Sequence, residues 1–299
     1  MYSKVSTHKK KRLTIGDILI YFGLFLIIVA TLYPFIYILS MSVSDPMAVV
    51  RREIWLLPKG FHLGAYTDAL YSQELLRSYG NTIWYTFFGT IINVVLTMTL
   101  AYPMSRRSFS LRKVINLMAV ITMFISGGII PLFVVVNQLK LYNTRFSMIF
   151  PVAINTFNLI IARTFLEELP VDISEAAYID GANDLTIFLR IVLPLAMPAV
   201  AVLTLYYAVA HWNTYFTALL YLPDAKLQPM QIYLRKILIQ QTNEGTAAVV
   251  GDSFGLSRAM KIEQMKYSSI IITTLPILIV YPFLQKYFVQ GVMIGALKG

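Results

Sequence analysis

Six long stretches of this sequence contain almost no charged residues, and they limit the fold more than any other feature. About 20 consecutive apolar residues are needed for a helix to cross the hydrocarbon core of a bilayer. Five stretches reach that length, and the fourth reaches it if it continues through Arg163 to Leu166, with the Arg163 side chain extended to the interface. The sequence therefore predicts an all-α polytopic membrane protein with six transmembrane helices, at residues 18–44, 78–105, 114–139, 146–162, 191–223 and 267–285.

Composition supports a membrane environment and excludes several other classes. Of the 299 residues, 57% are hydrophobic and 13% are charged, against about 45–50% and 25% in a soluble domain. The absence of cysteine rules out disulfides and cysteine-ligated metals. The net charge of +10 comes from basic residues that flank the apolar stretches and form no stripe with aromatic residues. We therefore expect membrane lipid as a partner, and no nucleic acid.

Basic residues predict the orientation of the chain. Short segments rich in Lys and Arg stay in the cytoplasm, and such clusters lie at residues 9–12 and 106–113. Summed over all loops, the two sides nearly tie, because segments 45–77 and 224–266 also carry basic residues. The short segments weigh most, so we expect a cytoplasmic N-terminus at 1–16, a six-helix domain at 17–289 and a cytoplasmic tail at 290–299. A signal peptide is the alternative, but the first apolar stretch exceeds its usual core of about 7–15 residues.

An acidic segment between the fourth and fifth stretches is predicted to form a short helix outside the membrane. Pro170 ends the preceding helix, and Asp172 and Glu175 have the spacing of a capping box, which predicts a new helix from residue 173. Gly181 is suited to the left-handed position after the helix end. Asn183 is suited to cap a second helix that continues into the fifth span.

Ala176 and Ala177 give this short helix a surface with almost no side chains. Such a helix can lie deep in a groove of another protein. It can equally lie on the membrane surface among the lipid headgroups. The residues by themselves leave both interpretations open.

The same segment resembles a known signature. Seven residues match the EAA signature of ABC-importer permeases, the binding-protein-dependent transport inner membrane components, at every position: Glu175, Ala176, Ala177, Gly181, Ile191, Leu193 and Pro194. Residues 124–131, 139–144 and 281–299 are similar to the carbohydrate branch of this family, which includes permeases for maltose-type sugars and for oligosaccharides from complex polysaccharides. The resemblance implies a type I ABC-importer permease fold.

The resemblance also implies partners and roles. Residues 172–189 would form a coupling helix held in a cleft of a cytoplasmic ATPase subunit, with contacts near Glu175, Ala176, Ala177, Asp180, Gly181, Asn183, Leu193 and Pro194. The assembly would contain a second homologous permease, two ATPase subunits that hold ATP and Mg²⁺, and an extracytoplasmic solute-binding protein. Its substrate would be a carbohydrate, and its location the bacterial-type cytoplasmic (inner) membrane. The tail at 290–299 is either a second contact with the ATPase or a frayed end.

Polar and aromatic residues in the predicted spans are candidates for the substrate pathway, because polar groups in membranes tend to face a bundle interior or a cavity. Gly127, Gly128 and Pro131 are expected to bend the third span near the same place. Alternatively, the polar residues satisfy one another or belong to an aromatic belt at the outer interface. The candidates are His211, Trp212, Asn213, Tyr215 and Asn155.

Signatures of enzymes are missing from the sequence. There is no Gly-x4-Gly-Lys-[Ser/Thr] phosphate loop, so we expect no ATP site in this chain, and the three histidines have no metal-binding spacing. An ion-driven transporter would need Asp or Glu inside the spans, and a membrane-embedded enzyme would need a catalytic cluster. We therefore expect a transport protein that catalyses no bond chemistry and holds no cofactor of its own.

Overall fold

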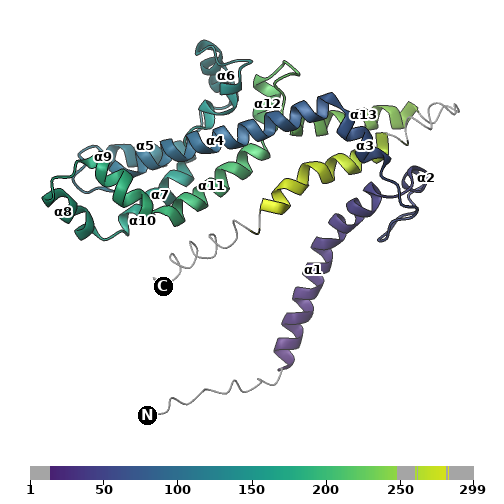
Figure 1. Ribbon diagram of the computed structural model, residues 1–299, viewed down its shortest axis with the longest axis horizontal. Coiled ribbons are helices and arrows are strands. Elements are labelled where there is room, and N and C mark those ends of the chain that lie inside the picture. The colour runs from purple at the N-terminus through teal and green to yellow at the C-terminus, as the bar shows by residue number, and fades with distance from the viewer. Residues whose placement is uncertain (1–13, 248–259, 261, 281, 283–299) are drawn as a thin grey trace. The chain divides into compact units, whose positions relative to one another are not determined.

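The computed structural model describes residues 14–247, 260, 262–280 and 282, and most of them are helical. The chain divides into two compact units, one of residues 1–67 and 243–271 and the other of residues 68–242 and 272–299 (Figure 1). The predicted tail at 290–299 and the basic residues of the N-terminus lie outside the described residues.

The first unit begins with α1 (Ile15–Ser42), which corresponds to the first predicted span. The backbone N–H of Thr14 donates to the carboxylate of Asp17 over 2.9 Å and so caps the helix. The most apolar 18-residue window of α1 is not buried within the protein. Because apolar side chains surround this helix on all sides, it is suited to an apolar environment such as the membrane interior.

A small core lies after α1 in the same unit. The short α2 (Pro46–Val50) begins at a proline and is capped by Asp45. Met41, Val49 and Tyr267 meet in one buried cluster, and the amide of Gln264 donates to the Ser44 carbonyl over 3.0 Å. This unit therefore joins the segment after the first span to residues more than 200 positions later in the chain.

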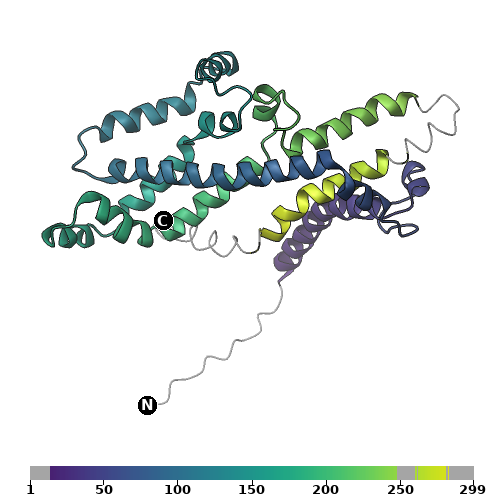
Figure 2. The same cartoon turned by 45° about the horizontal axis from the view of Figure 1, so that its top comes forward.

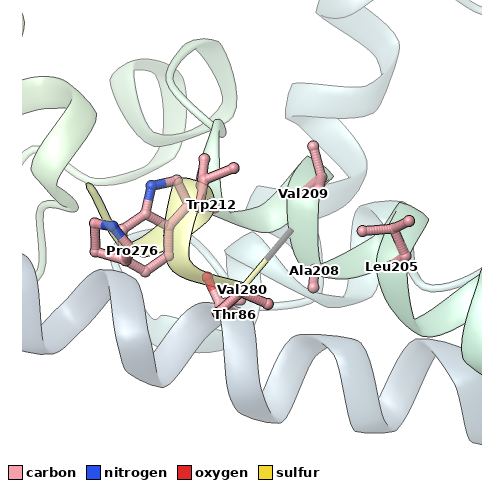
Figure 3. Close-up of a pocket in the computed structure, with 8 residues that line it drawn as sticks. Thr86, Leu205, Ala208, Val209, Trp212, Pro276 and Val280 are labelled. Carbon is pink, nitrogen blue, oxygen red and sulfur yellow. The ribbon is translucent and has the colours of Figure 1, made fainter. Parts of the chain in front are cut away.

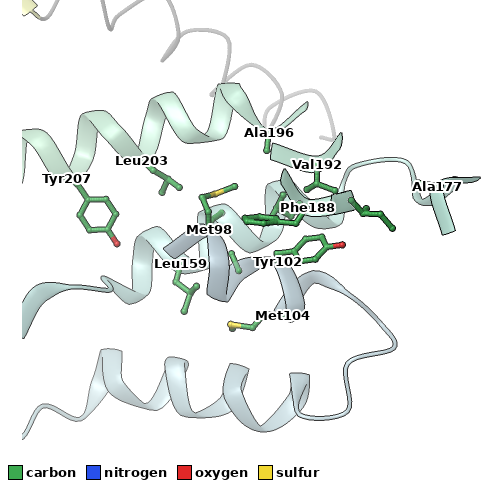
Figure 4. Packing of buried hydrophobic residues seen from close by; sticks show 14 residues of the cluster. Met98, Tyr102, Met104, Leu159, Ala177, Phe188, Val192, Ala196, Leu203 and Tyr207 are labelled. Carbon is green, nitrogen blue, oxygen red and sulfur yellow. The ribbon is translucent and has the colours of Figure 1, made fainter. Parts of the chain in front are cut away.

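The second unit is built around α4 (Gln73–Ser105), a helix of 33 residues that contains the second predicted span. The helices α7 (Thr156–Glu167) and α11 (Met197–Trp212) pack along it, as Figure 2 shows. Their shared core continues to the segment after α7 and includes Met98, Tyr102, Leu159, Ala177, Phe188, Val192 and Leu203 (Figure 4).

The other helices of this unit are shorter. α3 (Gly64–Tyr71) contains the boundary between the units, and residues 272–280 are helical. The remaining elements are α5 (Arg112–Phe124), α6 (Ile129–Gln138), η1 (Arg145–Met148), η2 (Phe150–Val152), α8 (Val171–Ile179), α9 (Asp184–Ile187), the π-turn η3 (Phe188–Val192), α10 (Leu193–Leu195), α12 (Phe216–Tyr221) and α13 (Met230–Ala247).

Within the described residues, two helices, α1 and α4, are long and apolar enough to cross a membrane. The number rises to four if two bent helix pairs each form one span. These pairs are Arg145–Val152 with Thr156–Glu167, bent by 54°, and Asp184–Leu195 with Met197–Trp212, bent by 79°. The total of six spans stays a prediction.

The third predicted span is not one continuous helix, so that expectation was wrong. α5 and α6 are separated by residues 125–128, and Gly128 adopts a left-handed φ of 83°. The predicted bend at Gly127 and Gly128 is therefore a full break. A residue with a Cβ would adopt the positive φ of Gly128 only with strain. Pro131 lies in the first turn of α6, where it disturbs no hydrogen bond of the helix.

Candidate functional site

The predicted short helix outside the membrane is α8, and local chemistry explains both of its ends. It begins at Val171, directly after Pro170, and not at residue 173. The predicted capping box of Asp172 and Glu175 is therefore wrong: Pro170 is the N-cap residue, with an extended ψ of 123°, and Asp172 already lies in the first helical turn.

The turn after α8 agrees with the sequence. Gly181 has a left-handed φ of 81°, and the Asn183 side chain accepts a hydrogen bond from the backbone N–H of Thr186 over 2.8 Å and caps α9. Tyr178 donates a hydrogen bond to the Asp184 carboxylate. This bond is the main reason that the pKa of Tyr178 is raised to about 12, because ionisation would place two negative charges side by side.

The two faces of α8 differ. Ser174 and Ala177 are buried, with 5% and 8% of their surface exposed, and Ala177 belongs to the shared core with α4 and η3. On a helix, the residues opposite this pair are Asp172, Glu175, Ala176 and Ile179. All four are exposed, Ile179 by 87%, and we call them the outward face of α8.

The residues predicted to contact the ATPase therefore divide into exposed and packed positions. Glu175, Ala176 and Asp180 are exposed and free to meet a partner. The side chain of Ala177 packs against its own chain, so its small size allows α8 to approach the core. Leu193 packs against the same core, and Pro194 begins the last turn before the bend.

An open polar cavity of about 910 Å³ lies between the ends of α4 and α7 and the beginning of α8. Arg106 from the end of α4 and Ser174 and Glu175 from α8 are among its lining residues. The cavity thus carries guanidinium and carboxylate groups next to α8. Among the described residues, no group of three or more His, Cys, Asp or Glu side chains is placed to hold a metal ion.

An ion-pair network holds α5 and α7 together at the edge of this cavity. The Glu167 carboxylate accepts hydrogen bonds from Arg112 Nη2 over 2.5 Å and from Arg163 Nε over 2.9 Å. Arg163 also donates to Asn116 of α5 over 2.8 Å. Burial raises the pKa of Glu167, but the hydrogen bonds and charges of Arg163 and Arg112 outweigh it and lower the pKa below its ordinary value.

The predicted pathway residues separate into three environments. His211 is only 4% exposed, and its Nε2 lies 3.2 Å from the amide nitrogen of Asn93 on α4. Asn155 caps α7, and its backbone N–H donates to the Tyr207 hydroxyl over 3.0 Å. Tyr207 in turn shares a hydrogen bond of 2.7 Å with Thr97. His211 and Asn155 therefore belong to a polar seam between α4, α7 and α11.

Trp212 lies in a different place from His211. Its indole N–H donates to the Thr273 carbonyl over 3.1 Å, and its ring lines an apolar cavity of about 160 Å³ with Thr86, Leu205, Pro276 and Val280 (Figure 3).

Asn213 and Tyr215 follow the end of α11. Asn213 is exposed, while Arg235 lies over the Tyr215 ring at 5.4 Å. The five candidates therefore do not form one cluster.

Sequence reasoning missed Asn93, Thr97, Arg106 and Ser174. The first two could have been found, because polar residues recur at helical spacing along the second apolar stretch at positions 82, 86, 90, 93 and 97. The contact between Arg106 and Ser174 joins residues 68 positions apart and leaves no such periodic signal.

Known proteins similar to this chain are components of transport systems. The family described as binding-protein-dependent transport system inner membrane component matches residues 89–294. A polygalacturonan/rhamnogalacturonan transport system permease protein of Bacillus subtilis (strain 168) is 39% identical over 95% of this chain and 98% of its own length. Protein LplC of the same organism is 40% identical over 90% of both chains.

A solved structure is similar over nearly the whole chain. It comes from a bacterial ABC transporter involved in the import of the acidic polysaccharide alginate. The similarity has a TM-score of 0.84 and 33% sequence identity, and it covers 93% of this chain and 100% of the other.

Proposed function

Since this chain belongs to the family of binding-protein-dependent transport system inner membrane components, we propose that it is a permease subunit of an ATP-driven importer of oligosaccharides. The family consists of transport components, so the chain is a membrane transport protein and not an enzyme. The observation that carries the proposed substrate class is the 39% identity with a polygalacturonan/rhamnogalacturonan permease over 95% of the chain.

In this proposal, the chain forms half of the translocation pathway and a second, homologous permease forms the other half. Two ATPase subunits bind ATP and Mg²⁺ and supply the driving force, and an extracytoplasmic solute-binding protein delivers the sugar. Asn213 and Tyr215 are the best candidates for contact with substrate, because they are more accessible than His211, which is buried within the seam. Opening and closing of such a pathway is a rigid-body transition between two states.

The outward face of α8 is proposed to be the contact with an ATPase subunit. Its middle is the small residue Ala176, and its end is Ile179, an apolar side chain that is 87% exposed. An exposed isoleucine on a polar surface favours burial against a partner, with a gain of roughly 1.5–3 kcal/mol when it is fully buried. Glu175 and Asp180 add charged groups at the edge of the same contact.

The contact can be tested by purification of the transporter in detergent. Ile179→Asp should abolish retention of the ATPase subunits, because it replaces the apolar side chain at the end of the proposed contact by a charge that would have to be buried. Leu57→Asp is the matched control, since Leu57 is 74% exposed and lies in the loop predicted on the opposite side of the membrane. Full retention of the ATPase by the Ile179 variant would contradict the assignment of this face.

The substrate class can be tested by uptake in cells. A strain without this chain should lose uptake of labelled oligogalacturonates and should keep uptake of glucose. Loss of maltotetraose uptake alone would indicate a neutral oligosaccharide. Unchanged uptake of both oligosaccharides would contradict the proposed substrate class.

A further inference from the structure

The end of α4 is joined to α8 by a polar contact that lies outside the EAA signature. Arg106 follows α4 directly, and its Nη2 donates to the Ser174 hydroxyl over 2.8 Å. The same guanidinium lies over the ring of Tyr102, 4.8 Å from its centre. The Tyr102 ring is in turn packed against Phe188 of η3 at 4.9 Å. One side chain thus lies at the meeting point of α4, α8 and η3.

The contact lies at the wall of the open polar cavity, where Ser174 is buried and Arg106 is half-buried. Ser174 is 5% exposed, and the Nε of Arg106 is buried with no acceptor among the described residues. Hydrogen bonds and an aromatic face stabilise a half-buried guanidinium. The hydroxyl of Ser174 and the ring of Tyr102 supply these contacts here, and removal of either partner removes one of them.

The contact differs mechanically from the packing beside it. Ala177 packs against the core and resists movement of α8 toward α4, but its single methyl group buries little apolar surface, so it resists separation only weakly. A hydrogen bond from a charged donor is directional and stronger than a neutral one, so it resists separation. The two contacts together hold α8 to α4 in both directions.

We propose that Arg106 is a positioning residue that transmits movement of α8 away from the core to α4, an inference that rests on the importer function proposed above. α4 packs along α7 and α11, so a displacement that reaches α4 reaches the three-helix core of this unit. Arg106 needs no contact with the ATPase for this role; it acts through Ser174.

The test uses the complete transporter in proteoliposomes, with its ATPase subunits, its solute-binding protein and oligogalacturonates as the probe. The variants are Ser174→Ala, Arg106→Met and the two combined. Arg107→Met is the matched control, because Arg107 is the exposed neighbour of Arg106. Three quantities are measured: retention of the ATPase subunits, unstimulated ATP hydrolysis, and the ratio of stimulated to unstimulated hydrolysis.

Both single variants should keep the ATPase subunits and the unstimulated rate. Their stimulation ratio should fall roughly tenfold, the size expected for loss of a hydrogen bond to a charged group. The combined variant should lose no more than either single one, because all three remove the same contact. Arg107→Met should behave as the wild type.

Two results would overturn the proposal. A wild-type stimulation ratio in Ser174→Ala and Arg106→Met would mean that the contact carries no movement. Parallel loss of ATPase retention and unstimulated hydrolysis would mean that Ser174 only maintains the fold. A wild-type transporter that retains no ATPase would overturn the proposed function itself, which distinguishes the two failures.

Discussion

Two glycines on α4 differ in how closely neighbouring atoms approach them. Gly89 faces α11 so closely that a Cβ on it would lie 2.5 Å from the His211 ring, whereas Gly80 has no neighbouring atom within 4 Å of that position. The glycine at 89 therefore allows the close approach that lets the His211 ring reach Asn93. At residue 80 a glycine has no such packing role.

We expect Gly89→Ala to destabilise the protein by about 1–3 kcal/mol, because the added methyl group overpacks the seam. Gly80→Ala should be neutral or slightly stabilising, since alanine is the better helix former. Thermal unfolding in detergent checks both. Equal melting temperatures for the two variants would contradict the close approach of α4 and α11.

At this scale the sequence predicts what is local. Gly181 and Asn183 were predicted correctly because a left-handed backbone and a helix cap depend on neighbouring residues alone. The helix start predicted at Asp172 was wrong, because Pro170 takes the N-cap position two residues earlier. The partner of His211 lies 118 positions away, and no local rule joins the two residues.

Ion pairing joins two elements, α5 and α7, through the Glu167 carboxylate. Its pKa in the folded protein lies below the ordinary value. A lowered pKa means that the pairing stabilises the fold fully above the ordinary pKa of a glutamate. The contribution is lost as the pH falls through the folded value.

Glu167→Gln should therefore lower the free energy of unfolding by about 1 kcal/mol at neutral pH, or roughly 2–4 °C in melting temperature. The difference from the wild type should shrink as the pH falls from the ordinary glutamate pKa through the lower folded value, because the carboxylate then becomes protonated in both states. Melting curves at pH 7 and at a series of acidic pH values test this. If the difference in melting temperature does not depend on pH, the substitution acts through altered packing and not through the lost charge.

Elements were predictable where hydropathy alone decides them. α1 and α4 fall where the first and second spans were expected, because both are long and free of internal breaks. The third stretch is also apolar but contains a pair of glycines, and the positive φ of Gly128 accompanies its division into α5 and α6. Hydropathy cannot distinguish a bend from a break.

For the whole molecule, the orientation in the membrane and the number of spans stay predictions. The chain contains no cysteine, so single cysteines can be introduced without removal of others. Ser108→Cys should react with a membrane-impermeant maleimide only after the cells are permeabilised, because residues 106–113 are expected in the cytoplasm. Ala225→Cys should react in intact cells. The reverse pattern would invert the topology.

The bend of 79° between Asp184–Leu195 and Met197–Trp212 has a consequence for any force applied on the side predicted to be cytoplasmic. When two rigid rods meet almost at a right angle, a shift along the axis of the first has almost no component along the second. It displaces the second rod sideways. A pull on the first rod would therefore change the width of the space beside α11 and would not drive that helix through the bilayer like a piston.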